Sequence, residues 1–420
     1  MKFKKVRGVK DILPQEVEKI NFVVNTCRQI VESYGFKEVI LPVLERMELY
    51  QHSIGETTDI VEKQMFKIEN KNLAEEQTET IVLRPEGTAG IVRMFVENNF
   101  KDKYSLKRFY YFGPMFRYER PQKGRYREFY QFGIEIFGEP SPSSDFLLIK
   151  IVNSVFEKLK IKVDLEINSI GCKNCRKNYV VELKKELEKI KESLCDVCKN
   201  RIGKNPLRVF DCKTDVDKVK KLAEKVNIQN YLCESCKKNF DDLIKLLDEN
   251  KISYKIVPTL VRGLDYYNGT VFEYKTQLLD AAQNTICAGG RYDEFFSQVE
   301  PQVSYACGLA FGIDRIVEVI KEYKGKNDKI KVGIAIVDDK FLSVGFKVLN
   351  KLLESKENVQ IVGPFAEKSL KSQLRLFNNE NCKYVVIVGE ETGQNKIVLK
   401  NFYNNSQQVV ELQNLDKFIV

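Results

Sequence analysis

Apolar residues in the first quarter of the chain follow helical spacing in two places and form one short run. From residue 16 to residue 33 they recur every three or four positions and Gly35 follows, which predicts an amphipathic helix. Residues 39–44 form an apolar run that contains Pro42, and a proline restricts such a run to an edge or interface strand. Helical spacing returns between residues 84 and 99.

Two segments rich in aromatic and β-branched residues, 107–117 and 128–137, predict antiparallel strands joined by a basic loop. Residues of one parity share a face of a strand, and the even positions from 130 to 136 are apolar, so they are expected to face the core. The residues of the other face are expected to form the floor of a small-ligand site. An aromatic ring there could stack on a flat ligand ring, and an amide and a carboxylate could bind its N–H groups. An exposed strand with unrelated polar residues is the alternative. The floor residues are Phe129, Gln131, Gly133, Glu135 and Phe137.

The second half of the chain changes character twice. Residues from about 172 to 250 are rich in lysine and glutamate, follow helical spacing and hold seven of the eleven cysteines, which predicts a helical insertion. Strand-like segments resume from residue 253, and we expect the strands on both sides of the insertion to share one sheet. Beyond a charged linker at 321–331, strands and helices alternate, which predicts a small α/β domain with a mostly parallel sheet.

Composition narrows the class of protein. A chain of 420 residues with 43% hydrophobic and 30% charged residues is expected to fold into two or three domains, and a net charge of +9 favours an anionic partner. The first residues contain no apolar signal segment, so eleven cysteines predict reduced thiols in a cytoplasm. No apolar run approaches the roughly 20 residues of a membrane span. The single histidine, His52, excludes mechanisms that need two imidazoles and is predicted to be structural or exposed.

Positive charge is concentrated around the predicted basic loop. Five cations lie within eleven residues and would repel one another unless an anion such as a triphosphate or an RNA backbone binds among them. A solvated basic loop is the alternative. No phosphate-binding or dinucleotide-binding glycine motif is present, so a bound nucleotide would be held by arginines and an aromatic surface. The cations are Arg117, Arg120, Lys123, Arg125 and Arg127.

Four further segments are unusually polar for their surroundings. Residues 83–90 open a helix with Glu86 and Thr88, and residues 308–315 turn from a strand into a helix that presents Arg315. Residues 260–269 and 288–293 each combine glycine, arginine, tyrosine and aspartate, as expected of loops that approach an anion. An ordinary turn at 289–291 is the alternative.

Taken together, these segments resemble those of class II aminoacyl-tRNA synthetases, and specifically bacterial histidyl-tRNA synthetases, over essentially the whole chain. Arg-Gly-Val-Lys-Asp at 7–11, the proline strand, the paired strands around Arg117 and Phe129, and Gly-Ile-Asp-Arg at 312–315 are similar to general motifs of the class. Leu-Val-Arg-Gly-Leu-Asp-Tyr-Tyr at 260–267 and Ala-Gly-Gly-Arg-Tyr-Asp at 288–293 are similar to blocks peculiar to the histidine enzymes.

The resemblance implies an α+β catalytic domain on an antiparallel sheet, the class II synthetase fold, at residues 1–325 with the helical cysteine-rich insertion at about 172–250. It implies a C-terminal α/β anticodon-binding domain at residues 326–420. The implied activity is the ligation of L-histidine to tRNA(His), dependent on ATP and Mg²⁺, through histidyl-adenylate. A cytoplasmic homodimer is the implied assembly.

The resemblance also implies roles for individual residues. Arg117 would clamp the α-phosphate and the histidine carboxylate, Arg262 would take the place of a cation at the α-phosphate, and Arg315 would lie on the γ-phosphate. ATP would be bound by Arg117, Glu119, Arg125, Phe129, whose ring stacks under adenine, and Arg315. Histidine would be bound by Glu86, Gly87, Thr88, Arg117, Gln131, Glu135, Arg262, Tyr266, Tyr267 and Tyr292.

The insertion cysteines leave two interpretations open. Cys172 and Cys175, and Cys195 and Cys198, have the spacing of structural zinc ligands, and Cys212, Cys233 and Cys236 lie nearby. The resemblance implies no required metal, and cysteines are often small buried residues. A structural Zn²⁺ is therefore compatible with the spacing but not favoured, and no catalytic metal ligand is expected.

Two other functions compete with the enzyme. A catalytically silent relative, such as a regulatory subunit of histidine biosynthesis or a sensor of uncharged tRNA, is disfavoured because Arg117, Arg262 and Arg315 are retained. A synthetase for another amino acid is disfavoured because Glu135 and the Tyr-Tyr block suit an imidazole. The basic residues Lys368, Lys371 and Arg375 are predicted to contact the anticodon stem.

Overall fold

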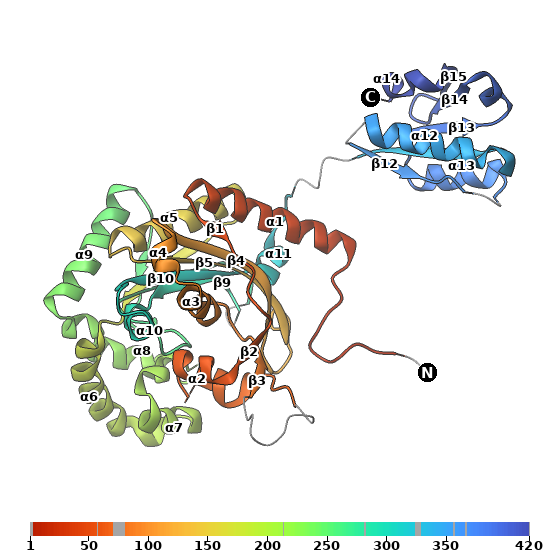
Figure 1. Cartoon of the computed structure of the whole chain (residues 1–420). Coiled ribbons are helices and arrows are strands. Elements are labelled where there is room, and N and C mark those ends of the chain that lie inside the picture. Colours follow the sequence, from red (N-terminus) through yellow and green to blue (C-terminus); the bar gives the residue numbers. More distant parts are fainter. Residues whose placement is uncertain are drawn as a thin grey trace. The chain divides into compact units, whose positions relative to one another are not determined.

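The structure is a computed structural model that describes residues 3–56, 58–69, 80–212, 214–280, 283–323, 329–355, 358–365 and 368–419. It divides into two compact units, Met1–Tyr323 and Lys324–Val420 (Figure 1). The predicted boundary between residues 325 and 326 lies outside the described residues.

The first unit is built on a sheet of eight strands in the order β1-β4-β5-β10-β9-β8-β6-β7. All neighbours are antiparallel except the end pairs β1/β4 and β6/β7, which confirms the predicted class of sheet. The strands that flank the insertion, β6 and β7, share this sheet as expected. The bounds are β1 Lys37–Glu38, β4 Lys107–Phe116, β5 Glu128–Phe137, β6 Asp164–Ser169, β7 Lys255–Ile256, β8 Thr270–Lys275, β9 Thr285–Arg291 and β10 Ala306–Gly312.

Hydrophobic cores lie on both faces of this sheet. The even residues of β5, Phe132, Ile134 and Ile136, pack with apolar residues of α1 (Pro14–Ser33), α5 (Ser143–Lys158) and α11 (Ile313–Val319). The opposite face packs against α2 (Met47–Ile54), α3 (Thr88–Glu97) and α10 (Asp293–Val299). Phe137 stacks on Phe296 in this second core, with ring centroids 4.6 Å apart. The odd face of β5 is therefore apolar at Phe137, and the predicted ligand floor ends at Glu135.

The proline run is not a strand, which corrects the prediction for residues 39–44. β1 ends at Glu38 and β2 (Leu44–Arg46) begins at the last residue of the run, where it pairs with β3 (Ile81–Leu83). The segment between them is held by isolated bonds, from Val39 N to the carbonyl of Tyr110 and from Arg84 N to the carbonyl of Val43, both 2.9 Å. A proline has no N–H to contribute to a ladder, so regular pairing stops around it.

The glycine pair at 289–290 is part of β9 and not a turn. A side chain at Gly289 would place its Cβ 2.3 Å from the carbonyl oxygen of Gly308, and one at Gly290 would lie 2.6 Å from that of Thr270. Both glycines therefore allow neighbouring strands to approach closely. The turn interpretation is wrong because the sequence does not show which backbones the pair lies against.

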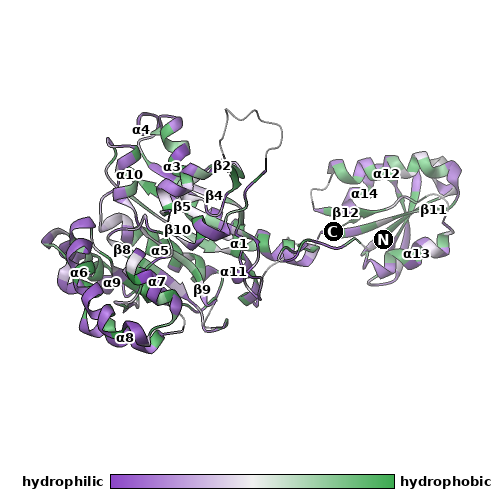
Figure 2. Cartoon of the chain, turned by 90° about the horizontal axis from the view of Figure 1, so that it is seen from below, coloured by the Kyte–Doolittle hydropathy of each residue, from purple (hydrophilic) through white to green (hydrophobic). Residues whose placement is uncertain are grey.

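The insertion between β6 and β7 consists of α6 (Lys173–Ile190), α7 (Asp196–Lys204), α8 (Val216–Lys225) and α9 (Glu234–Glu249). These helices lie together at one side of the first unit (Figure 1). α6, α7 and α8 share a small core of their own that includes Tyr179, Leu183 and Cys198, whereas α9 packs into the main core through Phe240, Leu243 and Leu247. Hydrophilic and hydrophobic residues are interleaved along each helix (Figure 2), as expected where only one face of a helix is buried.

The second unit has a five-stranded sheet in the order β12-β11-β13-β14-β15. β11 pairs in parallel with β12 and β13, whereas β14 pairs antiparallel with β13 and β15, so the sheet is mixed and the prediction of a mostly parallel sheet is wrong. No described helix of either unit is both long enough and apolar enough to cross a membrane. The bounds are β11 Ile330–Ile336, α12 Leu342–Ser355, β12 Val359–Val362, α13 Leu370–Asn379, β13 Tyr384–Val388, β14 Lys396–Asn401, β15 Ser406–Glu411 and α14 Leu415–Phe418.

Candidate active site

A buried carboxylate occupies the centre of the sheet, at Glu135 on β5. Glu135 is fully buried and accepts hydrogen bonds from the hydroxyls of Thr88 at 2.8 Å and Tyr292 at 2.6 Å. The neighbouring strand leaves room for it at Gly308, where a Cβ would lie 1.5 Å from Glu135 Oε2. Burial raises the pKa of Glu135 to about 8, although the two hydroxyls oppose that rise. We call Glu135 and its surroundings, with Glu86, Thr88, Tyr111, Tyr266 and Tyr292, the Glu135 pocket.

A second carboxylate, Glu86, lies at the start of α3. It accepts hydrogen bonds from the backbone N–H groups of Thr88 at 2.7 Å and Ala89 at 2.8 Å, which would otherwise have no partner at a helix start. Tyr266 donates its hydroxyl to Glu86 over 3.5 Å. Burial raises the pKa of Glu86, while these N–H groups and the charge of Arg117 oppose the rise. The two carboxylates thus mark two ends of one polar pocket.

Tyr111 on β4 closes the space between these carboxylates. A Cβ at Gly87 would lie 2.3 Å from the Tyr111 ring, and one at Gly133 would lie 2.1 Å from it. Burial raises the pKa of Tyr111, and the charges of Glu135 and Glu86 raise it further. The glycines at 87 and 133 therefore allow the Tyr111 ring to approach the backbone closely at both positions.

Three arginines from distant segments lie around one region beside the pocket; we call Arg117, Arg262 and Arg315 the arginine cluster. Burial lowers the pKa of Arg117, and the charge of Arg262 lowers it further. Burial likewise lowers the pKa of Arg315, as do the charges of Arg125 and Arg117. Like charges that perturb one another in this way must be close in space.

Protein oxygens hold each arginine of the cluster in place. Arg117 donates from Nε to the carbonyl of Pro85 over 2.9 Å, and its guanidinium carbon lies 5.2 Å from the centre of the Phe129 ring. Arg315 donates from Nη1 to the carbonyl of Thr285 over 2.7 Å. Arg262 is ion-paired with Glu273, a partner that raises its pKa against the opposing effect of burial.

One donor of this cluster has no protein partner. Nε of Arg262 is buried and makes no hydrogen bond to any atom of the described residues. Buried donors are almost always paired, so an unpaired one beside two other arginines is the mark of an anion site. The chemistry of the region is therefore that of a nucleotide phosphate or a carboxylate.

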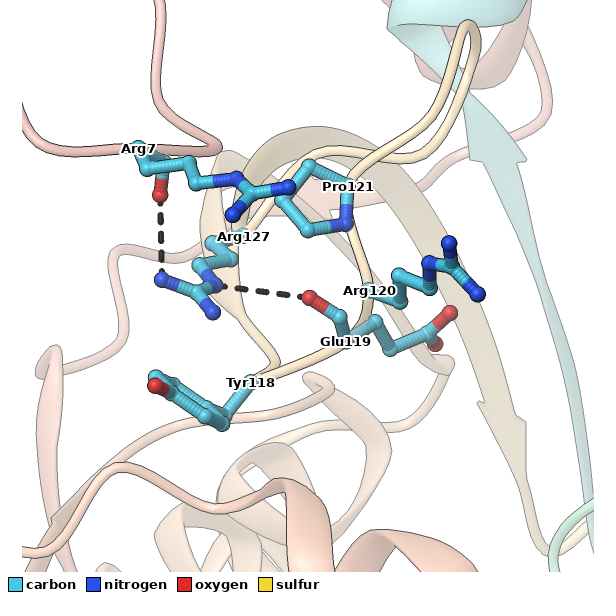
Figure 3. Close-up of a pocket in the computed structure, with 6 residues that line it drawn as sticks. All are labelled: Arg7, Tyr118, Glu119, Arg120, Pro121 and Arg127. Carbon is cyan, nitrogen blue, oxygen red and sulfur yellow. Dashed lines mark hydrogen bonds between the residues drawn. The ribbon is translucent and has the colours of Figure 1, made fainter.

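The basic loop does not direct all of its cations to one place. Arg127 donates to the carbonyls of Arg7 at 3.1 Å and Glu119 at 3.3 Å and lies over the ring of Tyr118 (Figure 3). These residues line a small open pocket of about 340 Å³. Lys123 pairs with Glu318 at 2.7 Å, and Arg125 pairs with Glu119 at 3.2 Å. Only Arg117 and Arg125 lie close enough to Arg315 to lower its pKa, whereas Arg127 and Lys123 have other partners, so the prediction that all five cations surround one anion is wrong.

Comparison with known proteins agrees with this geometry. A model of the histidyl-tRNA synthetase family matches residues 8–316, and a model of an anticodon-binding domain matches residues 331–420. The histidine–tRNA ligase of Nitratiruptor sp. is 39% identical over 416 residues, which are 99% of each chain. That of Thermodesulfovibrio yellowstonii is 40% identical over 422 residues, 100% of this chain and 98% of the relative. The chain belongs to the histidyl-tRNA synthetase family.

A solved structure supports the same assignment. Apo S. aureus histidyl-tRNA synthetase matches with a TM-score of 0.79 and 28% identity, and the match covers 100% of both chains. Histidyl-tRNA synthetases ligate histidine to tRNA(His) with ATP, and the adenylate intermediate is general to class II synthetases. The resemblance, the fold class and the type of enzyme predicted from the sequence are thereby confirmed.

Within this histidyl-tRNA synthetase fold, the predicted histidine-binding residues come together from five separate segments. Glu86, Gly87 and Thr88 begin α3, Gln131 and Glu135 lie on one face of β5, and Tyr292 follows β9. Tyr266 and Tyr267 are buried side by side, with ring centroids 4.6 Å apart. The ring of Tyr266 also meets that of Tyr292, at 5.5 Å. The other predicted residues, Glu119, Arg125 and Phe129, lie with Arg117 at the adjoining strand ends.

Sequence reasoning missed two residues of this synthetase site. Tyr111 on β4 has the same parity as Arg117, which directly follows the strand, so strand periodicity could have placed it on the pocket face. Glu273 on β8 pairs with Arg262 and accepts a 3.0 Å hydrogen bond from the hydroxyl of Thr285. Nothing in the local sequence around Glu273 indicates that role, because both partners lie on other segments.

One arginine of the histidine-specific blocks has a structural role. Arg291 is buried and is held by Asp145 at 2.8 Å and Asp293 at 3.0 Å. The anions that it meets are therefore the protein's own carboxylates, which corrects the expectation of a ligand there. His52 is exposed on α2, as predicted.

Proposed function

We propose that the Glu135 pocket binds the histidine substrate and that the arginine cluster binds ATP, so that adenylate forms between them. The observation that carries this proposal is the position of Arg117. Its pKa responds to Glu86 in the pocket, to Glu119 at the strand end and to Arg262 in the cluster. Arg117 also donates to the carbonyl of Pro85, next to Glu86, so a group between both regions is suited to clamp the histidine carboxylate and the α-phosphate together.

Imidazole recognition is assigned to Glu135. Its pKa of about 8 is close to the ordinary value of about 6.5 for imidazole, so the pair can share a proton near neutral pH. Tyr292 and Thr88 hold the carboxylate in place, and Gln131, Tyr266 and Tyr267 complete the pocket. A buried site that pairs a polar ring rejects analogues without the polar atoms, because its own groups are then left unpaired.

The α-amino group of histidine is assigned to Glu86, with Gly87 and Thr88. Its carboxylate is held by backbone N–H groups, so its orientation does not depend on the substrate. Burial removes water from the Glu86 carboxylate, and the cationic amine of histidine beside it would compensate for part of that loss. Histidine then spans the pocket from Glu86 to Glu135, with its carboxylate left for Arg117.

Adenylate formation is the attack of the histidine carboxylate on the α-phosphate, with pyrophosphate as the leaving group. Negative charge accumulates on the phosphate oxygens in that transition state, and donors fixed in advance around it lower the barrier. Arg117 and Arg262 are assigned to the α-phosphate and Arg315 to the γ-phosphate. Glu119 and Arg125 hold the rest of ATP, and Phe129 supplies the surface for adenine.

Mg²⁺ accompanies ATP in this family and prefers oxygen ligands, most of them from phosphates and water. Glu119 and Glu273 are the carboxylates beside the arginine cluster, where they are ion-paired with Arg125 and Arg262, and either would supply an oxygen ligand to the ion. When bound, the ion would neutralise charge on the phosphates. The positioning of the reacting carboxylate is left to Arg117.

Pyrophosphate exchange with each of the twenty amino acids tests the proposed function. We expect exchange with histidine alone, because only histidine satisfies both Glu86 and Glu135. Exchange with another amino acid would identify a different synthetase. Folded protein without exchange for any amino acid would identify a silent relative.

A homodimer is the proposed assembly. Two apolar side chains that flank Pro42 are exposed, Ile40 at 92% and Leu44 at 52%, which is unusual in a segment similar to a dimer-interface motif. Isologous pairing would cover the same patch on both copies. Light scattering should give twice the chain mass and Ile40→Asp should give the monomer mass; a monomeric native chain would contradict the assembly.

Contact with the anticodon stem is proposed for the basic end of the second unit. Lys368 precedes α13, Lys371 and Arg375 lie on it, and all three are exposed. Phosphate contacts of this kind weaken as salt increases. The double variant Lys371→Ala/Arg375→Ala should raise the KM for tRNA and leave pyrophosphate exchange unchanged. A cytoplasmic location stays a prediction.

A further inference from the structure

Seven of the eleven cysteines gather in two groups within the insertion. We call Cys172, Cys175, Cys233 and Cys236 the first cysteine group, and Cys195, Cys198, Cys212 and Asp215 the second cysteine group. In each group the four sulfur or carboxylate ligand atoms all lie within 4.8 Å of one another. These are the only such sets of cysteine, histidine and acidic side chains among the residues that the structure describes.

The spacing between sulfur atoms is that of ligands around one ion. Sγ of Cys172 lies 3.5 Å from Sγ of Cys175, and Sγ of Cys195 lies 3.7 Å from Sγ of Cys212. Tetrahedral zinc with bonds of about 2.3 Å places its sulfur ligands about 3.8 Å apart. A disulfide would need about 2.05 Å. The groups therefore match metal coordination and not oxidised pairs.

Every ligand pair lies at the start of a helix. Cys172, Cys195 and Cys233 are the N-cap residues of α6, α7 and α9, and Asp215 is that of α8. In the three Cys-x-x-Cys pairs the second cysteine lies three residues after the N-cap, in the first turn, whereas Cys212 lies three residues before the N-cap Asp215 of α8. The positive end of a helix favours the thiolate form, and the thiolate is the form that binds metal.

Backbone N–H groups already point at the ligand atoms. Cys233 N donates to Sγ of Cys175 over 3.1 Å, and Thr214 N and Asp215 N donate to Sγ of Cys212 over 3.3 Å each. In the second group, Cys195 N donates to the Asp215 carboxylate over 2.9 Å. Such bonds orient the ligands and balance the negative charge of a sulfur-rich site.

The remaining cysteines of the same chain serve as an internal comparison. Cys27, Cys287, Cys307 and Cys382 are all buried, dispersed through the hydrophobic cores, and belong to neither group, whereas of the other seven only Cys175 and Cys198 are buried. Buried cysteines act as small apolar residues in such positions. Packing explains those four, but it does not explain why the other seven converge on two points.

The two groups connect different helices of the insertion. The first group joins the start of α6, a helix of the small core, to the start of α9, which packs into the main core of the first unit. The second group joins α7 to α8. A lysine-rich and glutamate-rich helical unit with a small core commonly needs such cross-links.

We propose that the insertion binds two structural Zn²⁺ ions, one in the first cysteine group and one in the second. The first site is Cys₄ and the second is Cys₃Asp, and both are closed four-ligand sites with no position for a substrate. Zinc accepts sulfur and carboxylate oxygen ligands in one tetrahedral site, which suits both sets.

Zinc binding in the insertion would also support the active site. Arg176, one residue after Cys175, donates to the carbonyl of Tyr267 over 3.0 Å. Asn205 donates to Asp265 over 3.1 Å. The segment that carries Arg262 and Tyr267 is thus held partly by residues of the insertion, whose helices the two ions would fix. This consequence rests on the proposed function, whereas the zinc content does not.

Metal analysis of the full-length chain, purified without a histidine tag, tests the proposal. We expect about two zinc ions per chain. The pair Cys233→Ser/Cys236→Ser should lose one ion, and the pair Cys198→Ser/Cys212→Ser should lose the other. Cys382→Ala, outside the insertion, is the matched control and should keep both.

If the variants fail to fold, X-ray absorption at the zinc edge, measured on the wild-type chain, tests whether cysteine sulfur atoms bind the zinc. The two sites together predict an average of about 3.5 sulfur ligands per zinc, at about 2.3 Å. Zinc below about 0.2 per chain, zinc bound mainly by nitrogen or oxygen, or stoichiometric iron in its place would each overturn the proposal.

Discussion

The active site and the insertion both bring like groups together from distant segments, but they hold them differently. Each arginine of the cluster is fixed by a protein carbonyl or carboxylate, as Arg315 is by Thr285 and Arg262 by Glu273. The cysteine groups are held by a few backbone N–H bonds and by one another. The comparison indicates that the fold organises the candidate active site before any ligand binds, whereas in the insertion the proposed zinc ions would add cross-links to a small hydrophobic core.

The largest expected effect is on the rate of adenylate formation, and it is expected without a comparable loss of fold stability. Arg262→Ala should lower pyrophosphate exchange by roughly three orders of magnitude, because one fixed donor at the transition state is removed. The midpoint of thermal unfolding should fall only modestly, because Glu273 keeps Lys275 at 3.6 Å and the hydroxyl of Thr285 at 3.0 Å as partners when Arg262 is removed. Arg28→Ala, on α1 and far from the cluster in sequence, is the control for loss of an arginine. Near-normal exchange by Arg262→Ala would contradict its role.

The next effect concerns substrate recognition. Glu135→Gln should raise the KM for histidine roughly a hundredfold, because a buried charge-assisted hydrogen bond to the imidazole is lost. The KM for ATP should stay close to the wild-type value, since the hydrogen-bond partners of Glu135, Thr88 and Tyr292, lie outside the arginine cluster. Steady-state exchange kinetics with each substrate varied in turn measures both constants. An equal change in the two would indicate general disruption of the site.

The same residue predicts a pH dependence of stability. Burial raises the pKa of Glu135 from 4.5 to about 8, so between these values the folded chain keeps a proton that the unfolded chain has lost. The free energy of unfolding should therefore fall as pH rises, by up to about 1.4 kcal/mol per pH unit from this group. Glu135→Gln should show a shallower fall. Urea unfolding of both proteins between about pH 5 and pH 8 makes the comparison, and equal slopes would be inconsistent with a protonated Glu135.

The smallest expected effect is at the contact between the insertion and the segment that carries Arg262 and Tyr267. Arg176→Ala removes the bond to the carbonyl of Tyr267 and the 2.6 Å ion pair with Glu294. Loss of one such bond to the pocket segment should raise the KM for histidine about fivefold, an energy of about 1 kcal/mol. The zinc content should remain at two, because no ligand is changed. A loss of zinc would show that Arg176 acts on the metal site instead.

Strand periodicity and the paired motifs predicted much of this site from sequence. The alternation in β5 identified Glu135 and the floor from Phe129, because a two-residue period follows directly from strand geometry. The resemblance supplied Arg262 and Arg315, whose convergence no local pattern shows. Tyr111 and Glu273 were missed because their roles depend on partners across the sheet.

The predictions from sequence that the structure corrects have a common physical origin. Pro42 lies in an apolar run that satisfies strand propensity, yet pairing stops there because the backbone lacks a donor. Gly289 and Gly290 have the composition of a turn, yet they lie in β9 because neighbouring backbones approach them closely. In the second unit, β15 is mostly exposed and polar, so hydrophobicity did not reveal the antiparallel edge of its sheet. Each case depends on the neighbouring strands, which the local sequence does not specify.

The most direct test of the proposed site is a crystal structure with histidine and a non-hydrolysable ATP analogue bound. The proposal predicts the imidazole against Glu135 and Tyr292, and the α-phosphate within hydrogen-bond reach of both Arg117 and Arg262. A nucleotide bound elsewhere, for example in the open pocket beside Arg7 and Arg127, or an imidazole remote from Glu135, would contradict it.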